Sequence, residues 1–259
     1  MKLARVLAVS LAALVCSAAP ASAAPTAAAE SAAKAPTSAD KILAEIDRRA
    51  AVFADREYQA SMEIYGGGQL KKTLQFTMVM KGLDQQFLTF TAPGDIAGMK
   101  VLMEDAETLY VYMPEFKKVR RVAAHMQNQG FLGSTFTYED MTQVQLSPFF
   151  NAKVSSHEGS ETTLTLTAKN DKTTYKRVDI VIDATKGGVT VLRYFDGAGK
   201  LVRQQNREGW MKIEGELMPT KVTMADLKTG DITVVQLSDL KVNQGVEDDL
   251  FSRRMLLRG

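Results

Sequence analysis

Cysteine and histidine are almost absent from this sequence. Its 259 residues contain one cysteine, Cys16, and two histidines, His125 and His157. We expect Cys16 to be removed with the N-terminal segment, which would leave no disulfide, thiolate nucleophile or cysteine-based zinc site. The two histidines have no metal-ligand spacing to each other or to a pair of carboxylates. The commonest zinc and cysteine chemistries are therefore not expected.

A long apolar run is also missing, but a short one lies in the first 23 residues. Lys2 and Arg5 precede the apolar run 7–15, and Ala-Ser-Ala follows at 21–23. This order is typical of a secretory signal peptide. The run has about half the length of a membrane-spanning helix, and a bulky valine before the cysteine argues against lipidation. We predict cleavage near Ala23 and export, and the lack of cysteine favours the periplasm.

Excess charge of one sign is lacking as well. Removal of Lys2 and Arg5 lowers the 32 basic residues to 30, which equals the 30 acidic residues. A neutral chain gives no electrostatic reason to expect nucleic acid as a partner. Residues 24–38 are mostly Ala, Pro, Thr and Ser, a composition that cannot bury enough apolar surface to fold. We expect a flexible linker there, followed by one domain over 39–259.

Apolar spacing predicts one helix at the start of this domain. Residues at helical spacing favour an amphipathic helix over about 39–54, capped by Ser38, with Asp47 turned away from the apolar face. The segment 124–150 has no steady period, and a connection of this length is usually functional or partly helical. Acidic residues followed by basic ones predict a short closing helix over about 248–255.

From Tyr58 onward the apolar period is two, which predicts strands. Gly66-Gly67-Gly68 and similar turn residues separate them. No helical pattern interrupts 152–242, and parallel strands would require crossover helices, so the sheet should be mainly antiparallel. The fold class is mainly β, with about a dozen strands that curl into a barrel or half-barrel or split into a sandwich. The predicted strands are 58–64, 73–80, 85–91, 99–104, 108–113, 117–123, 152–157, 162–168, 175–183, 189–195, 200–214, 217–227 and 231–242.

No enzyme signature is present in the sequence. Gly-x-Ser-x-Gly is absent, and Gly66-Gly67-Gly68 lacks the following Lys-Ser/Thr of a phosphate loop. Glu139 and Asp140 are interpreted as solvated turn acids or a local cap. Basic residues around Arg120 and Arg121 fit an exposed edge strand, although an arginine fork suits a carboxylate or phosphate partner. We predict a protein that is not an enzyme and that holds no metal.

Methionine is frequent, with 13 residues, and several lie on apolar strand faces. Its flexible side chain suits surfaces that accept varied apolar shapes, although a plain β-core that uses methionine freely remains an alternative. We expect the helix and the segment 124–150 to act as a lid over an apolar pocket. The predicted pocket residues are Met62, Ile64, Phe76, Met78, Met80, Leu88, Phe90, Val101, Met103, Val111 and Met113. The predicted lid or partner contacts are Phe131, Phe136, Tyr138, Arg120 and Arg121.

Four sequence blocks, taken in order and spacing, resemble the outer-membrane lipoprotein-sorting proteins, the LolA-like group of periplasmic carriers. These blocks are Pro93-Gly94-Asp95 with Gly98 and Leu102, then 110–114 (YVYMP), 119–122 (VRRV) and 131–140 (FLGSTFTYED). The resemblance implies a half-open antiparallel barrel, like those of LolA and LolB, with helices at its mouth. It further implies that acyl chains of lipoproteins or lipids bind without catalysis and without a cofactor.

Two other functions stay open. The sheet could be fully packed, so that its edges or the segment 124–150 bind a protein such as an inner-membrane lipid transporter; a core without ligand space would favour this interaction module. An enzyme acting on lipids or cell-wall material would need a cleft with a carboxylate of raised pKa.

Overall fold

The computed structural model describes residues 38–258 except 106–107, 124–125, 127–128, 143 and 172. The expected signal peptide and most of the linker, together with His125, lie outside the described residues. All elements below belong to one unit that spans residues 36–259. No helix in this described part of the chain combines the length and apolar composition needed to cross a membrane.

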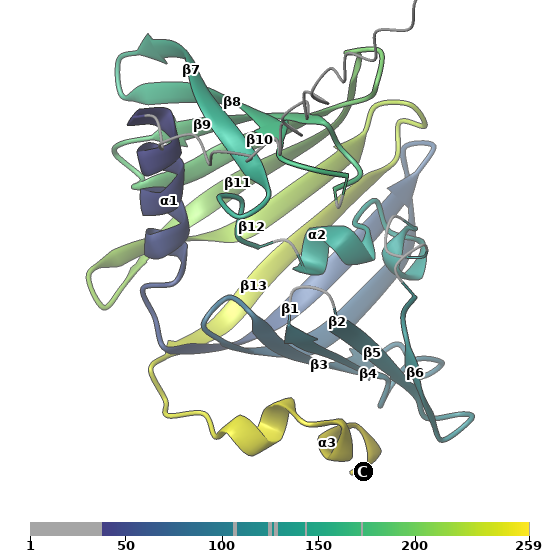
Figure 1. The fold of residues 1–259 in the computed structure, drawn as a ribbon. Coiled ribbons are helices and arrows are strands. Elements are labelled where there is room, and N and C mark those ends of the chain that lie inside the picture. Colours follow the sequence, from purple (N-terminus) through teal and green to yellow (C-terminus); the bar gives the residue numbers. More distant parts are fainter. Residues whose placement is uncertain are drawn as a thin grey trace, which may run out of the picture. The chain divides into compact units, whose positions relative to one another are not determined.

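A single antiparallel sheet of 13 strands forms the body of the unit (Figure 1). The strands are β1 (Asp55–Gly66), β2 (Gln69–Lys81), β3 (Gln85–Ala92), β4 (Lys100–Asp105), β5 (Thr108–Met113), β6 (Lys118–Arg121), β7 (Phe150–Glu158), β8 (Glu161–Ala168), β9 (Arg177–Asp183), β10 (Gly188–Phe195), β11 (Leu201–Ile213), β12 (Glu216–Asp226) and β13 (Ile232–Val242). Their order is β6-β5-β4-β3-β2-β1-β13-β12-β11-β10-β9-β8-β7. The sheet is curved, and because β6 and β7 are its two edges it is not a closed barrel.

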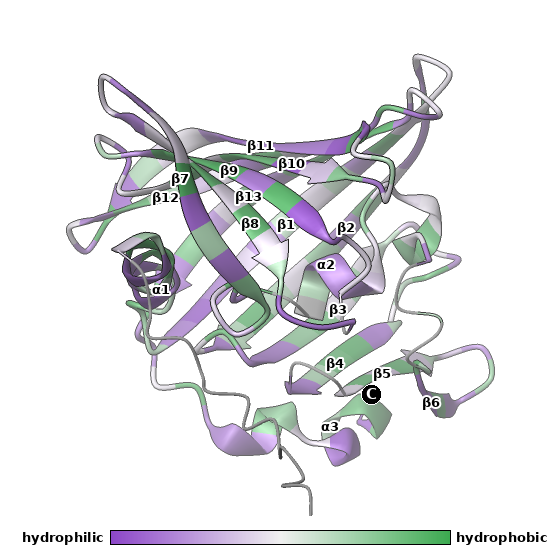
Figure 2. Cartoon of the chain, turned by 45° about the horizontal axis from the view of Figure 1, so that its top comes forward, coloured by the Kyte–Doolittle hydropathy of each residue, from purple (hydrophilic) through white to green (hydrophobic). Residues whose placement is uncertain are grey.

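The predicted strands are all present, because alternation of apolar and polar residues specifies both the strand and its buried face. In Figure 2 hydrophobic and hydrophilic bands alternate along several strands. The predicted turn at Gly66-Gly67-Gly68 joins β1 to β2, and Gly67 and Gly68 have φ of 59° and 77°. Positive φ at two consecutive turn residues is what a tight hairpin needs, and glycine adopts it without strain.

The helix α1 (Ser38–Ala50) packs against β7 and β10 (Figure 1). It ends at Ala50, not at residue 54 as predicted. The guanidinium of Arg56 donates to the Ala50 carbonyl at 2.9 Å, which satisfies one terminal carbonyl of the helix. Phe53, which the pattern placed on the helix, is buried just beyond its end.

Asp47 is not turned away from the apolar face, as we had predicted, but is buried. Its carboxylate accepts the backbone N–H of Leu146 at 3.1 Å and that of Ser147 at 2.7 Å. Burial of the carboxylate is tolerated because these hydrogen bonds replace water. The pairing crosses about a hundred residues of sequence, so helical spacing alone could not reveal it.

Four further short helices among the described residues cover the sheet. The 3₁₀ helix η2 (Phe131–Gly133) and α2 (Tyr138–Thr142) belong to the aperiodic segment, which is therefore partly helical. The chain closes with η3 (Asp248–Phe251) and α3 (Arg253–Leu257), where one short helix was predicted. Phe251 and Leu256 of this tail pack with Phe87 and Leu102, on the face of β3 and β4 opposite to η2.

Two larger clusters of buried residues lie on the other face of the sheet. Cluster 1 gathers side chains of β1–β5 together with Phe131, and cluster 2 gathers side chains of β7–β10 together with α1. The buried members of cluster 1 are Ala60, Met62, Ile64, Leu74, Phe76, Met78, Met80, Leu88, Phe90, Met99, Val101, Leu109, Val111 and Phe131. Those of cluster 2 are Ala39, Leu43, Phe150, Ala152, Leu164, Leu166, Val178, Ile180, Ile182, Val189 and Leu192.

Candidate functional site

A cavity of about 350 Å³ lies between the sheet, the C-terminal end of α1 and the segment that carries η2 and α2. This volume is within the range of small-molecule sites, about 300–1,000 Å³. The apolar side chains that line it come from β1–β3, β10–β13, α1 and the segments beside the helices. They are Ile46, Val52, Phe53, Tyr58, Met62, Phe76, Met78, Met80, Leu88, Phe131, Phe136, Met141, Val144, Val189, Trp210, Leu217, Met218, Val222, Val235 and Leu237. Val52 and Leu217 are exposed, so the cavity reaches the surface near them.

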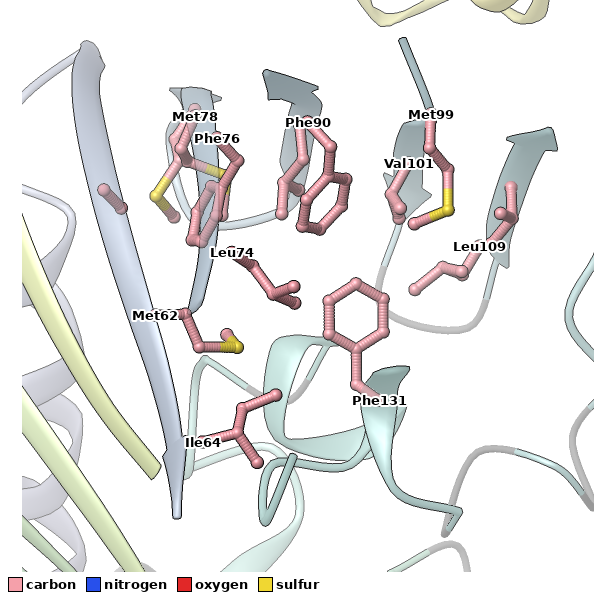
Figure 3. Packing of buried hydrophobic residues seen from close by; sticks show 14 residues of the cluster. Met62, Ile64, Leu74, Phe76, Met78, Phe90, Met99, Val101, Leu109 and Phe131 are labelled. Atoms are coloured by element: carbon pink, nitrogen blue, oxygen red, sulfur yellow. The ribbon is translucent and has the colours of Figure 1, made fainter. Parts of the chain in front are cut away.

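Residues 130–142, which we call the lid segment, form the wall of the cavity opposite the sheet. The segment closes on itself, because Phe131 donates its backbone N–H to the Phe136 carbonyl at 2.7 Å. Phe131 is only 1% exposed, and its ring lies 5.9 Å from that of Phe90 and 5.2 Å from that of Tyr138. Figure 3 shows the Phe131 ring projecting toward the row of side chains on the strands. The ring therefore anchors the lid segment in cluster 1.

Thr135 holds the lid segment to the middle of the sheet. Its backbone N–H donates to Thr233 Oγ1 on β13, and its hydroxyl donates to the Met224 carbonyl on β12, both at 2.9 Å. Arg203 on β11 donates to the Thr135 carbonyl at 2.6 Å. On β3, the amide of Gln86 donates to the Met141 carbonyl at 2.9 Å. The lid segment is thus bound to both sides of the seam between β1 and β13.

Asp140 and Arg203 form a buried ion pair between the lid segment and the sheet. Arg203 Nη2 lies 2.5 Å from Asp140 Oδ2, and the side chains are 6% and 8% exposed. Asp140 also accepts the backbone N–H of Thr137 at 2.7 Å, while the Thr137 hydroxyl accepts that of Asp140 at 3.1 Å. This reciprocal arrangement is a capping box at the start of α2. Of the two alternatives expected for Asp140, a solvated turn acid or a local cap, the structure shows the local cap.

The aromatic rings around Arg203 complete its environment. Its guanidinium lies 5.3 Å from the Tyr194 ring and 5.7 Å from the Tyr175 ring. Burial opposes the charge of Arg203, but the carboxylate of Asp140 raises the pKa of the guanidinium above its ordinary value. Burial raises the pKa of Tyr194 and raises that of Tyr58 to about 12, so both remain neutral phenols near neutral pH.

A smaller cavity of about 120 Å³ adjoins the first beneath α1. It shares Ile46, Ala50 and Val144 with the larger cavity, and also the polar side chains Gln205 and Arg207 of β11. Within the described residues, no group of three or more His, Cys, Asp or Glu side chains is arranged to hold a metal ion. The site offers an apolar volume with a few polar groups, chiefly arginines and amides.

Five of the eleven predicted pocket residues line the larger cavity: Met62, Phe76, Met78, Met80 and Leu88. The others lie deeper or to the side. Ile64, Phe90, Val101 and Val111 are buried within cluster 1, and Met113 packs partly buried against it. Met103 is 1% exposed but belongs to neither large cluster.

The predicted lid and partner residues fall into two groups. Phe131 and Phe136 line the cavity, and Tyr138 packs against cluster 1. Arg120 and Arg121 lie exposed on the edge strand β6 and do not line the cavity. Arg121 Nη2 donates weakly to Thr108 Oγ1 at 3.4 Å. A partner for these two arginines therefore stays a prediction.

Sequence reasoning missed the contribution of β11–β13 to the site. Arg203, Arg207 and Trp210 of β11 lie at or beside the cavity, as does Val222 of β12. The signal was the alternation of Arg203, Gln205 and Arg207 on one face of a predicted strand. This face meets the lid segment, which Arg203 contacts through Thr135 and Asp140.

One family of known proteins matches most of the chain. A family model described as "uncharacterized protein" matches residues 82–258. A search of the curated proteins gives no match.

Three solved structures share the architecture. A DUF1329 family protein from Desulfovibrio piger is 23% identical with a TM-score of 0.78, and the match covers 84% of this chain and 97% of that one. A putative outer membrane lipoprotein-sorting protein domain from Vibrio parahaemolyticus is 20% identical with a TM-score of 0.77, covering 85% and 98%. A LolA superfamily protein from Nitrosomonas europaea is 20% identical with a TM-score of 0.70, covering 85% and 99%. The fold expected from the resemblance is confirmed.

Proposed function

Because the chain belongs to the family whose model matches residues 82–258 and has the LolA-like fold, we propose that it is an exported carrier of acyl chains. In this proposal the signal peptide directs it to the periplasm, where the larger cavity takes the acyl chain of a lipoprotein or lipid destined for the outer membrane. The protein performs no chemistry on its cargo.

The cavity of about 350 Å³ carries this proposal. Its floor includes Met62, Met78 and Met80, whose flexible side chains can adapt to different acyl chains. Each buried methylene contributes about 0.8 kcal/mol, so part of one long chain suffices for micromolar binding. The interaction module that binds only proteins would have a filled core, and the cavity argues against it.

In this proposal the lid segment moves during loading, which widens the cavity beyond its opening near Val52 and Leu217. The Asp140–Arg203 pair and the hydrogen bonds of Thr135 hold it closed, and its removal would expose Phe131 and the cavity floor. In the proposed cycle a donor or acceptor in the envelope, such as an inner-membrane transporter, favours the open form. The cargo then replaces the contacts that the lid segment gives up.

The test is to purify the protein from the periplasm, extract it with organic solvent and identify bound lipids by mass spectrometry. Met78→Trp should fill the cavity and remove the lipid, because Met78 lines it. Thr77→Trp is the matched control, since Thr77 directly precedes Met78 on β2 and points to the opposite face of the sheet. Circular dichroism checks that both variants fold.

Stoichiometric acyl lipid in the wild type and in Thr77→Trp, but not in Met78→Trp, is the expected result. A folded wild-type protein that carries no lipid and takes up none when lipid is added would overturn the proposal.

A further inference from the structure

Two arginines on one face of β11 differ in their partners. Arg203 has the Asp140 carboxylate 2.5 Å away. Arg207, on the same face, has its Nε bonded to Gln205 Oε1 at 3.1 Å, and no described carboxylate is within ion-pair distance of it. Its Nη1 and Nη2 groups have no protein acceptor among the described residues. Four N–H donors therefore remain available at a position that lines both cavities.

The surroundings of Arg207 disfavour an isolated charge. Burial lowers the pKa of its guanidinium, in contrast to Arg203. Arginine nevertheless stays protonated in proteins, so the charge persists without a counter-ion. Arg207 is only partly exposed, and a charge that is largely shielded from water is costly unless it is paired and hydrogen-bonded. An anionic group of a ligand bound in the cavity would supply the missing counter-ion of Arg207.

Most of the other charged side chains that line the larger cavity are basic. Arg49, Arg56 and Lys186 also line it, whereas its acidic residues are Glu216 and Asp140, of which Asp140 is paired with Arg203. Arg56 is the poorer candidate for binding, because its Nη2 already donates to the carbonyls of Ala50 and Gly82. Its buried Nε has no acceptor within the part of the chain that the structure describes.

An apolar path connects Arg207 with the methionine floor. Arg207 pairs with Val222 of β12, Val222 with Val235 of β13, and Val235 with Met62 of β1. Directly paired residues point to the same face, and all four line the cavity. Three strand spacings separate the ends of this row, which is roughly 14 Å along the sheet. A head group on Arg207 can thus continue into a chain that crosses Val222 and Val235.

We propose that the ligand is an amphiphile with an anionic head, a carboxylate or phosphate, whose oxygens accept the Nη donors of Arg207. This inference rests on the proposed function, which places an acyl chain in the cavity. It adds that the cargo carries a negative charge at its head group. A planar guanidinium binds two oxygens of either group side by side. An acyl chain held only through ester or amide links has no such charge, so Arg207 selects acidic lipids over neutral ones.

Trp210 provides the measurement, because it is the only tryptophan and lines the cavity. Three ligands with the same dibrominated stearoyl chain are titrated: the free fatty acid, the lysophosphatidic acid and the neutral monoacylglycerol. Bromine quenches Trp210 when the chain enters. Arg207→Gln removes the charge, Arg207→Lys retains it, and Arg193→Gln on β10 is the control because Arg193 does not line the cavity.

We expect at least one acidic ligand to bind about 10- to 100-fold more tightly than the neutral one, the range of a charged hydrogen bond. Arg207→Gln abolishes this preference, Arg207→Lys keeps part of it, and Arg193→Gln leaves it unchanged. The stronger of the two acids identifies the head group as carboxylate or phosphate. If Arg207→Gln does not fold, the inference is tested by whether the wild-type protein binds the acidic ligands more tightly than the neutral one.

Equal binding of all three ligands would overturn the inference and leave the carrier function intact. If none of the three ligands quenches Trp210 fluorescence, both this inference and the carrier function are overturned.

Discussion

The strands β1–β5 and β7–β10 show the same alternation of apolar and polar residues, but the buried side chains that they contribute to clusters 1 and 2 differ. Cluster 2 consists of Leu, Ile, Val and Ala with one Phe, and α1 packs on it, leaving only the smaller cavity of about 120 Å³. Cluster 1 contains four buried methionines and three phenylalanines, and residues 130–142 cover it while leaving a cavity. Branched aliphatic side chains have few rotamers and interdigitate closely, whereas methionine tolerates irregular space. The half with aliphatic packing and the smaller cavity supports the half whose larger cavity can hold a ligand.

The largest expected effect comes from breaking the contact between lid segment and sheet. Asp140→Asn should lower the free energy of unfolding by about 4 kcal/mol, because it leaves Arg203 buried without its counter-charge. Urea unfolding followed by circular dichroism measures this. Adding Arg203→Met should recover part of the loss, and Asp171→Asn, in an exposed pair with Lys176, should change nothing measurable. A single variant as stable as the wild type would show that the lid segment needs no such pair.

A matched pair of leucines tests the difference in packing. Leu164 of cluster 2 is fully buried, whereas Leu88 of cluster 1 is 2% exposed and lines the cavity. We expect Leu164→Ala to cost about 4 kcal/mol and Leu88→Ala about 2 kcal/mol, since a side chain beside a void has fewer contacts to lose. Equal losses in urea unfolding would mean that the two halves are packed alike.

The smallest change in stability is expected from Met78→Leu. A volume-conserving swap of this kind costs less than about 1.5 kcal/mol. Leucine is stiffer, so the range of acyl-chain lengths bound should narrow, as measured by displacement of a fluorescent fatty acid. Met224→Leu is the control, because Met224 is fully buried but does not line the cavity. An unchanged range in Met78→Leu would argue that methionine serves only as core filling.

Local pattern was sufficient for the strands and insufficient for the site. Each strand can be predicted from a few consecutive residues, such as Tyr58 to Ile64. Apolar and polar side chains alternate there because successive side chains of a pleated strand point to opposite faces. The pairing of Asp140 with Arg203 joins positions 63 residues apart, and that of Asp47 with Leu146 joins positions 99 apart. Nothing near either aspartate indicates its partner. Asp47 was therefore placed away from the apolar face although its side chain is buried.

The central seam of the sheet also determines when the fold can be completed. In the described sheet the two successive meanders, β1–β6 and β7–β13, are joined by the pairing of β1 with β13, which are its first and last strands in sequence. Pairs of such high sequence separation form slowly, because the intervening chain must first be ordered. The C-terminal strand completes the middle of the sheet and supplies Thr233 to the lid segment. A chain that loses this strand would keep two half-sheets with their inner edges unpaired, which makes truncation there a route to aggregation.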